Sequence, residues 1–252
     1  MRIDAKGLSF KELNEKVREA VKSGASEVEL VNVNGQRFIG DGLTTPVTIV
    51  TRGSAGNDLG AFMSGPKILV KGNVADAAGN TMNEGAILID GRAGDVLGHS
   101  MRGGKILIRG SVGYRAGLHM KAYKDKNPTI VVGGTAEDFL GEYQAGGTIV
   151  VLALEHDNGR AIGDYVGTGM HGGRIFVKGA VSKDQLGPGA TIDEVTDADR
   201  SELKQAVEDY CRAFNVPVEQ ILSHMFTKIA PVSSRPFGKT YAIQSGDVPP
   251  KT

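Results

Sequence analysis

Short apolar runs alternate with glycine-rich polar stretches between residues 46 and 180, and the same arrangement recurs seven times. Each copy opens with a run that holds an isoleucine at an equivalent position, and these isoleucines are successively 19, 19, 19, 24, 19 and 26 residues apart. These isoleucines are Ile49, Ile68, Ile87, Ile106, Ile130, Ile149 and Ile175. The runs are too short and too often interrupted by glycine to be helices, so each is interpreted as a strand. Such self-similarity is typical of solenoids, in which one repeat forms one structural unit.

A glycine scaffold follows each apolar run. In the copies that begin at Ile49, Ile87 and Ile106, three glycines are spaced three and then four residues apart. In five copies a methionine stands three residues after the third glycine, at Met63, Met82, Met101, Met120 and Met170. Glycine costs conformational entropy unless the backbone requires it, so the recurring glycines mark the same corner in every copy. The repeat therefore predicts stacked coils with columns of isoleucine and methionine in the core.

We predict an all-β core formed by a right-handed parallel β-helix of about seven coils, with an α/β cap before it and an α-helical extension after it. The expected parts are a helix-hairpin cap at residues 1–45, the β-helix at 46–180, and a helical extension and tail at 181–252. The right-handed form is favoured because left-handed β-helices usually show a strict repeat of about six residues, which is absent.

The cap is expected to begin with a helix over residues 9–24, where Ser9 and Glu12 form a capping box and Gly24 is a fitting stop. Residues 27–31 alternate like a half-buried strand, and the turn signal Asn34-Gly35 predicts a hairpin that returns over residues 37–39. This unit is expected to cover the open edge of the first coil.

The segment after residue 180 predicts more helix. A capping pattern at Thr196 opens a second helix whose apolar face includes Cys211, and Pro217 begins a short third helix that ends at about Met225. Residues 228–242 are expected to be rich in turns, and an irregular basic segment of this kind is expected to wrap over a partner or over its own domain.

Two insertions interrupt the repeat. Residues 121–128 are expected to bulge outward as a charged loop, and residues 155–159 add a polar excursion. Insertions in solenoids usually lie on one face, which is often the binding face.

Composition narrows the functional classes. Lysine plus arginine balance aspartate plus glutamate at 29 each, which argues against a general nucleic-acid or membrane-surface binder. Cys211 is the single cysteine, so no disulfide framework or thiolate metal cluster is expected. The sequence shows neither a signal-peptide pattern nor a membrane-length apolar run. We therefore expect a soluble cytoplasmic protein with neither nucleic-acid nor membrane partners.

Candidate chemistry is sparse. The glycines do not follow the G-x-G-x-x-G spacing of nucleotide-binding turns. A metal site needs at least three convergent ligands, whereas the histidines differ in register from coil to coil and are expected to lie exposed or hydrogen-bonded in turns. The histidines are His99, His119, His156, His171 and His224.

Hydrolytic chemistry has little support either. Ser64, Ser100 and Ser111 lie outside any G-x-S-x-G elbow. The acidic pairs Glu137/Asp138 and Glu155/Asp157 could serve a glycosidase. Polysaccharide-processing β-helices, however, usually carry a groove lined with aromatic residues, whereas this chain has no tryptophan and only 6% aromatic residues. Cys211 and the methionine column are interpreted as core residues. No catalytic, cofactor-binding or metal-binding residue is assigned.

The repeat can be written I-x-[IV]-x-G-x-x-G-x-x-x-G-x-x-M-x-G-G, and residues 87–104 match it best. It closely resembles the carboxy-terminal GXGXG domain of the large subunit of glutamate synthase, and it is similar in the same way to one of the subunits of formylmethanofuran dehydrogenase. The resemblance covers about residues 1–225. The chain looks like the free-standing version of that domain, found where the large subunit is split into separate chains.

The resemblance implies a right-handed β-helix without catalytic residues of its own, acting as a structural scaffold in glutamate biosynthesis and nitrogen metabolism. In that family a glutaminase part releases ammonia with a cysteine nucleophile, and a synthase part carries FMN and an iron–sulfur cluster. This chain has neither an amino-terminal cysteine nor cluster-binding cysteines. The expected function is thus a non-catalytic subunit that spaces the glutaminase-type and FMN synthase-type subunits. FMN and the cluster are expected on those partners and no cofactor on this chain.

Other assignments stay open at this stage. The chain could join an N-methylglutamate synthase-like relative or a formylmethanofuran dehydrogenase complex instead. It could also be an autonomous β-helix hydrolase or lyase, which a cleft with converging ionisable groups would indicate. Exposed coil faces could finally support a homo-oligomer.

Overall fold

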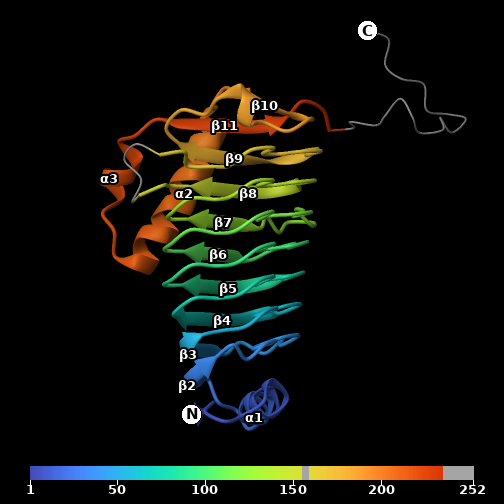
Figure 1. Cartoon of the computed structure of the whole chain (residues 1–252), viewed down its shortest axis with the longest axis vertical. Coiled ribbons are helices and arrows are strands. Elements are labelled where there is room, and N and C mark those ends of the chain that lie inside the picture. Colours follow the sequence, from blue (N-terminus) through green and yellow to red (C-terminus); the bar gives the residue numbers. More distant parts are fainter. Residues whose placement is uncertain (155–158, 235–252) are drawn as a thin grey trace, which may run out of the picture.

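A computed structural model describes residues 1–154 and 159–234. Eleven strands of the described chain form one sheet in the order β1-β2-β3-β4-β5-β6-β7-β8-β9-β11-β10. Their bounds are β1 Arg2–Asp4, β2 Glu27–Asn34, β3 Thr48–Ser54, β4 Ser64–Lys71, β5 Glu84–Ile89, β6 Lys105–Ile108, β7 Thr129–Val132, β8 Ala145–Val151, β9 Gly172–Lys178, β10 Ala190–Asp193 and β11 Phe226–Pro231. Each of the strands β1 to β9 pairs in parallel with the next strand along the chain. Helix α1 (Phe10–Lys22) lies between β1 and β2 in the sequence. Figure 1 shows the resulting stack of coils.

The isoleucine column of the sequence forms the interior of this stack. Ile49 pairs with Ile68, Ile68 with Ile87, and the same register continues up to Ile175. All seven isoleucines are fully buried, and so are the five repeat methionines. The parallel β-helix is therefore confirmed, and both predicted columns pack in its core.

The third glycine of each repeat makes room for this column. Gly79 has a φ of +71°, and a Cβ placed on it would collide with the side chain of Ile106, the isoleucine two repeats further along. Gly98 bears the same relation to Ile130, whose Cδ1 would lie 2.6 Å from an added Cβ. The glycine spacing thus follows both from the corner geometry and from the packing of the next coils.

The hairpin predicted near Asn34-Gly35 is wrong. β2 pairs in parallel with β3, and Val28 occupies the position of the repeat isoleucine because it pairs with Ile49. Residues 37–39 form no strand, since the chain continues around the coil after Gly35, whose N–H bonds the carbonyl of Ser54. The regular stack therefore begins at β2, before the expected start at residue 46.

Helix α1 covers the first coil. Its N-cap Ser9 and Glu12 form the predicted capping box. The buried face holds Leu13, Val17 and Val21, which belong to the same core cluster as the isoleucine column. In Figure 1 this helix lies below β2, at the end of the stack opposite β10 and β11.

The second end of the stack is closed by residues 183–231. η1 (Lys183–Gln185) precedes β10, and β11 pairs antiparallel with both β9 and β10. The prediction of a turn-rich segment from residue 228 is wrong for residues 228–231, which belong to β11. This strand forms because the edge of β9 offers unpaired backbone groups to pair with. The rest of that predicted segment, from residue 235, lies outside the described residues.

Two helices flank the sheet. The predicted capping pattern at Thr196 begins α2 (Asp197–Phe214), which packs on β6 to β9 through a second cluster that includes Cys211 and Phe176. α3 (Val218–Leu222) ends earlier than the predicted Met225. No helix in the described part of the chain is long and apolar enough to cross a membrane.

The insertion at residues 121–128 protrudes as predicted. Tyr123 and Lys126 bridge across it, and Lys121, Lys124 and Asp125 are exposed. The second insertion falls largely on residues 155–158, which lie outside the described residues.

Candidate functional site

The turns that return to the starts of the strands hold two columns of residues in the left-handed backbone conformation. All members have φ between 50° and 61°. The first turn column is Asp58, Ala77, Val96, Arg115, Phe139 and Tyr165, and the second turn column is Phe62, Thr81, Ser100, His119 and Tyr143. From Asp58 to Phe139 in the first column, and throughout the second, the N–H donates to a carbonyl of the next coil, as Val96 does to Tyr114 at 2.8 Å and His119 to Glu142 at 3.0 Å. The stacking of the coils thus fixes the same turn shape in each repeat.

Large side chains at these positions are unusual. A non-glycine residue in this conformation costs roughly 1–2 kcal/mol, because its Cβ approaches the backbone carbonyl. Phe62, Tyr143 and Tyr165 bear that cost while 55%, 40% and 54% exposed. Burial in the core therefore does not account for aromatic residues here, and such strained positions point to a function.

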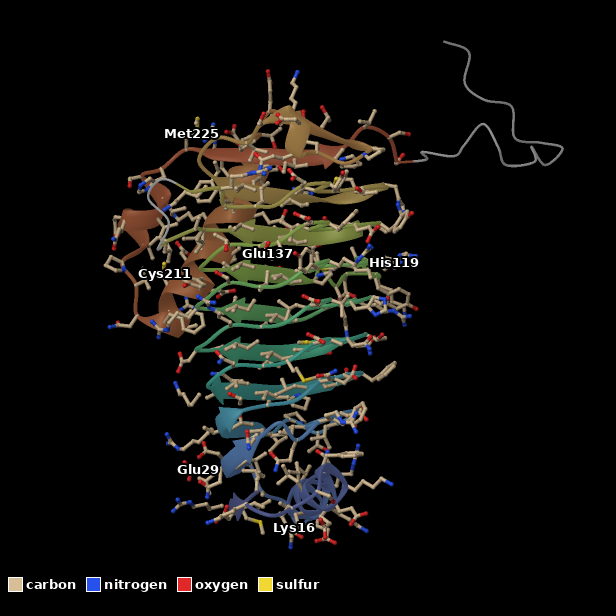
Figure 2. All side chains as sticks on the ribbon, viewed as in Figure 1. Lys16, Glu29, His119, Glu137, Cys211 and Met225 are labelled. Carbon is tan, nitrogen blue, oxygen red and sulfur yellow. The ribbon has the colours of Figure 1, made fainter. Side chains whose placement is uncertain are left out.

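Side chains of four successive coils stack along these columns. His119 lies parallel to Tyr143 with ring centroids 5.2 Å apart, and His99 tilts against His119 at 6.2 Å. Phe139 stacks on Tyr165 at 5.0 Å. We call these six residues the aromatic edge: His99, Arg115, His119, Phe139, Tyr143 and Tyr165. Figure 2 shows His119 on the turn side of the stack, across from Cys211 of α2.

Arg115 of the first turn column contacts two residues of the next coil. Its guanidinium lies 4.5 Å from the ring centre of Phe139 and forms an ion pair with the buried carboxylate of Glu142. A cation over an aromatic face stabilises both groups. Burial is the main cause that lowers the pKa of His99, and the electrostatic interaction with His119 lowers it further, against the opposing effect of Asp58. His99 therefore favours its neutral form near pH 7.

An acidic margin borders the edge. It comprises Asp58, Asp76, Asp95 and Asp138, none of which forms an ion pair within the described residues. Three of these carboxylates accept a backbone N–H from the next coil, as Asp138 does from Asp164 at 2.8 Å and Asp95 from Tyr114 at 2.9 Å. These backbone hydrogen bonds hold three carboxylates of the margin in place on the turns that carry the two columns.

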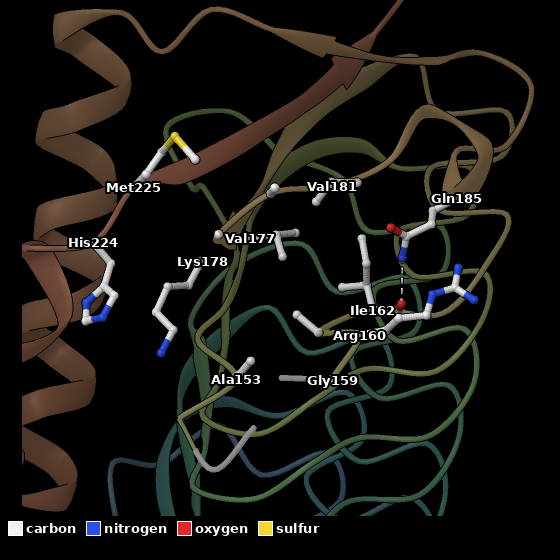
Figure 3. A pocket seen from close by; sticks show the side chains of 13 residues that line it. Ala153, Gly159, Arg160, Ile162, Val177, Lys178, Val181, Gln185, His224 and Met225 are labelled. Atoms are coloured by element: carbon white, nitrogen blue, oxygen red, sulfur yellow. Dashed lines mark hydrogen bonds between the residues drawn. The ribbon is translucent and has the colours of Figure 1, made fainter. Parts of the chain in front are cut away.

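A cavity of about 630 Å³ lies at the upper end of the stack. Figure 3 shows Lys178, His224 and Met225 on one side of it, and Arg160, Ile162 and Gln185 on the other. Arg160 is paired with Asp164, and Gln185 donates to the carbonyl of Ile162 at 2.9 Å. Among the described lining residues there is neither a nucleophile next to a base nor a pair of carboxylates. The described lining residues therefore offer no constellation for hydrolysis.

The histidines predicted to lie in turns do so where they are described. His171 bonds the nearby carbonyl of Gly169, and His224 lies in the cavity wall. His99 and His119 come together, although the sequence separated them by register. His156 lies outside the described residues, and the described residues hold no group of three or more histidine, cysteine, aspartate or glutamate side chains that could bind a metal ion.

The other candidate residues from the sequence take part in the packing and hydrogen bonding of the fold where they are described. Ser111 bonds Thr135, and Ser100 belongs to the second turn column. Asp138 bonds the backbone of the next coil, whereas Glu155 and Asp157 lie outside the described residues. Cys211 is a core residue as predicted.

Sequence reasoning missed the aromatic edge. The signal is present, because His119 and Tyr143 are 24 residues apart, as are Ile106 and Ile130. Phe139 and Tyr165 are 26 residues apart, like Ile149 and Ile175. Aligning exposed positions by the same intervals as the core would have placed these rings in columns.

Comparison with known proteins gives two findings. Residues 11–232 match a family described as "GXGXG motif". The chain is also 52% identical over 248 residues to the uncharacterized protein MJ1350 of Methanocaldococcus jannaschii, and the alignment covers 95% of each chain.

Proposed function

Because the chain belongs to the GXGXG motif family, we propose that it is a non-catalytic structural subunit of a glutamate synthase-like oxidoreductase complex. In this proposal it spaces a glutaminase-type subunit and an FMN synthase-type subunit. FMN and an iron–sulfur cluster would be held by those partners, and this chain would hold the two reaction centres at a fixed distance from each other.

The observation that carries the proposal is the continuity of the stack within the matched region. Strands β2 to β9 form one uninterrupted parallel ladder, and both ends are covered by other elements of the chain. At about 4.8 Å per coil, seven steps between coils span roughly 34 Å. Each coil is fixed by buried side chains on both sides, so the stack resists bending and suits a spacer.

A tagged copy of the full chain, expressed in its source organism and purified under mild conditions, tests the proposal. Mass spectrometry of the bound chains should identify a glutaminase-type chain and an FMN synthase-type chain in constant ratio to the tagged one. Subunits of a formylmethanofuran dehydrogenase would instead move the chain to that complex. Recovery of the tagged chain alone would contradict a subunit role and call for assays of the purified chain.

Reconstitution then tests the spacing role. The two catalytic chains should each retain their partial reaction when mixed without this chain. Glutamate formation from glutamine should require its addition, because ammonia released by one centre must reach the other. Equal rates of glutamine-dependent synthesis with and without the chain would contradict the spacer.

A further inference from the structure

The aromatic edge is a surface with features of a docking site. Tyr143 and Tyr165 expose large parts of their rings at strained backbone positions, and the ring of Phe139 contacts both Arg115 and Tyr165. Exposed aromatic clusters that are rimmed by charge mark interaction sites. Aromatic rings and arginine are also the side chains that contribute most to binding at interfaces.

Charge defines the occupant that fits. No residue of the acidic margin forms an ion pair within the described chain, so a complementary segment carries lysine or arginine between flat apolar side chains. Residues 235–252 have that chemistry: three cationic residues and one acidic one, with Phe237 and Tyr241 among them. The pattern is alternating, since Arg235, Phe237, Lys239, Tyr241 and Ile243 occupy every second position. An extended chain would present all five on one face.

The described chain ends near the edge. The N–H of Val232 bonds Gly189 at 2.9 Å, and the N–H of Gly169 bonds Pro188 at 2.7 Å. Gly169 follows Tyr143 in the second turn column, and a Cβ on it would lie 2.5 Å from the Tyr143 ring. In Figure 1 β11 runs toward the side where strands β3 to β9 begin, which is the side of His119 in Figure 2.

The length of the segment is sufficient. At about 3.3 Å per residue, eighteen extended residues span roughly 60 Å. The four coils of the aromatic edge span only about 15–20 Å at 4.8 Å per coil. The segment can therefore reach every ring of the edge from its own end of the stack.

We propose that residues 235–252 bind the aromatic edge of the same molecule. Phe237 and Tyr241 lie against the rings of Phe139, Tyr143 and Tyr165, and Lys239 faces the acidic margin. This binding covers the exposed rings in the isolated chain. It does not depend on which complex the chain joins, so it can fail or succeed independently of the proposed function.

Photo-crosslinking of the purified full chain tests the proposal. p-Benzoylphenylalanine replaces Phe237, and tryptic peptides are identified by mass spectrometry after irradiation. Links should form to the peptides that carry Phe139, Tyr143 or Tyr165. Their yield should stay constant over about a hundredfold dilution, because binding within one molecule does not depend on concentration. Links between molecules, links only to other surfaces, or no links would overturn the proposal.

Paired variants provide the controls. Tyr143→Ser with Tyr165→Ser should lower the yield roughly three- to tenfold, the effect of losing aromatic contacts. Phe62→Ser should leave it unchanged, because Phe62 has the same turn geometry but lies outside the aromatic edge. In the segment, Lys239→Glu should lower the yield, whereas Thr240→Glu, on the other face, should lower it less. Equal yields in both members of each pair would contradict docking at this edge.

Discussion

Single turn residues show how the coil geometry limits side-chain choice. Phe62 has φ of 56° and is half exposed, so its ring gains little from burial while its backbone is strained. We expect Phe62→Gly to be more stable than Phe62→Ala by about 1 kcal/mol, because only alanine retains a Cβ in the left-handed conformation. Urea unfolding of the two variants measures the difference, and both lack the aromatic ring.

A strand position provides the opposite expectation. Lys67 is exposed in β4, where extended backbone disfavours glycine. Lys67→Gly should therefore be less stable than Lys67→Ala by about 0.5–1 kcal/mol. If glycine were also the less stable substitution at position 62, the left-handed strain assigned to the turn columns would be wrong.

Cys211 gives a second prediction at this scale. It lies on the buried face of α2, and burial raises the pKa of its thiol, with smaller contributions from Glu219 and Glu208. The thiolate is the reactive form, so modification of the folded protein should be roughly a hundredfold slower or more than in the unfolded chain. Reaction with a chromogenic disulfide in buffer and in urea gives both rates. Comparable rates would place the thiol at the surface.

Elements were predictable to the extent that they repeat. The isoleucine intervals alone set the register of β3 to β9, because each slip would turn a buried side chain outward. Val28 was harder to identify because the glycine scaffold is incomplete after it, and Asn34-Gly35 resembles a hairpin turn. β11 has no pattern of its own and forms because it meets the edge of β9. Predicting the aromatic edge would have required both the register of the coils and the outward direction of each turn residue.

The glycine corners lead to a prediction for the whole element. Gly98→Ala should destabilise the protein by more than about 2 kcal/mol, since it adds left-handed strain to a collision with Ile130. Adding Ile130→Val removes the Cδ1 that collides and should restore part of the loss. Thermal unfolding of the two single variants and the double variant measures the coupling. Strictly additive effects would show that the two positions do not compete for space.

At the closed end of the stack, one carboxylate links three elements of the molecule, α2, β9 and β11. Asp199 of α2 accepts from Arg174 of β9 at 2.9 Å and from Lys228 of β11 at 2.9 Å. The side chains of Asp199 and Lys228 are only 4% and 11% exposed. Burial by itself would raise the pKa of Asp199, but the hydrogen bonds from Lys228 and Thr196 outweigh it and lower the pKa to about 2.

This depressed pKa makes the closure sensitive to acid. The carboxylate contributes stability above its unfolded pKa of 3.8, and the contribution disappears as the pH falls through about 2. At pH 7 we expect Asp199→Asn to lower the free energy of unfolding by about 2 kcal/mol, the value of a shift of nearly two pKa units. Urea unfolding of both proteins at pH 7, 4 and 2 should show the difference narrowing below pH 4. Asp197→Asn, at an exposed acid in the first turn of α2, should change stability by only about 0.5 kcal/mol. A difference between wild type and Asp199→Asn that persisted at pH 2 would mean that packing of the side chain, rather than its charge, closes the stack.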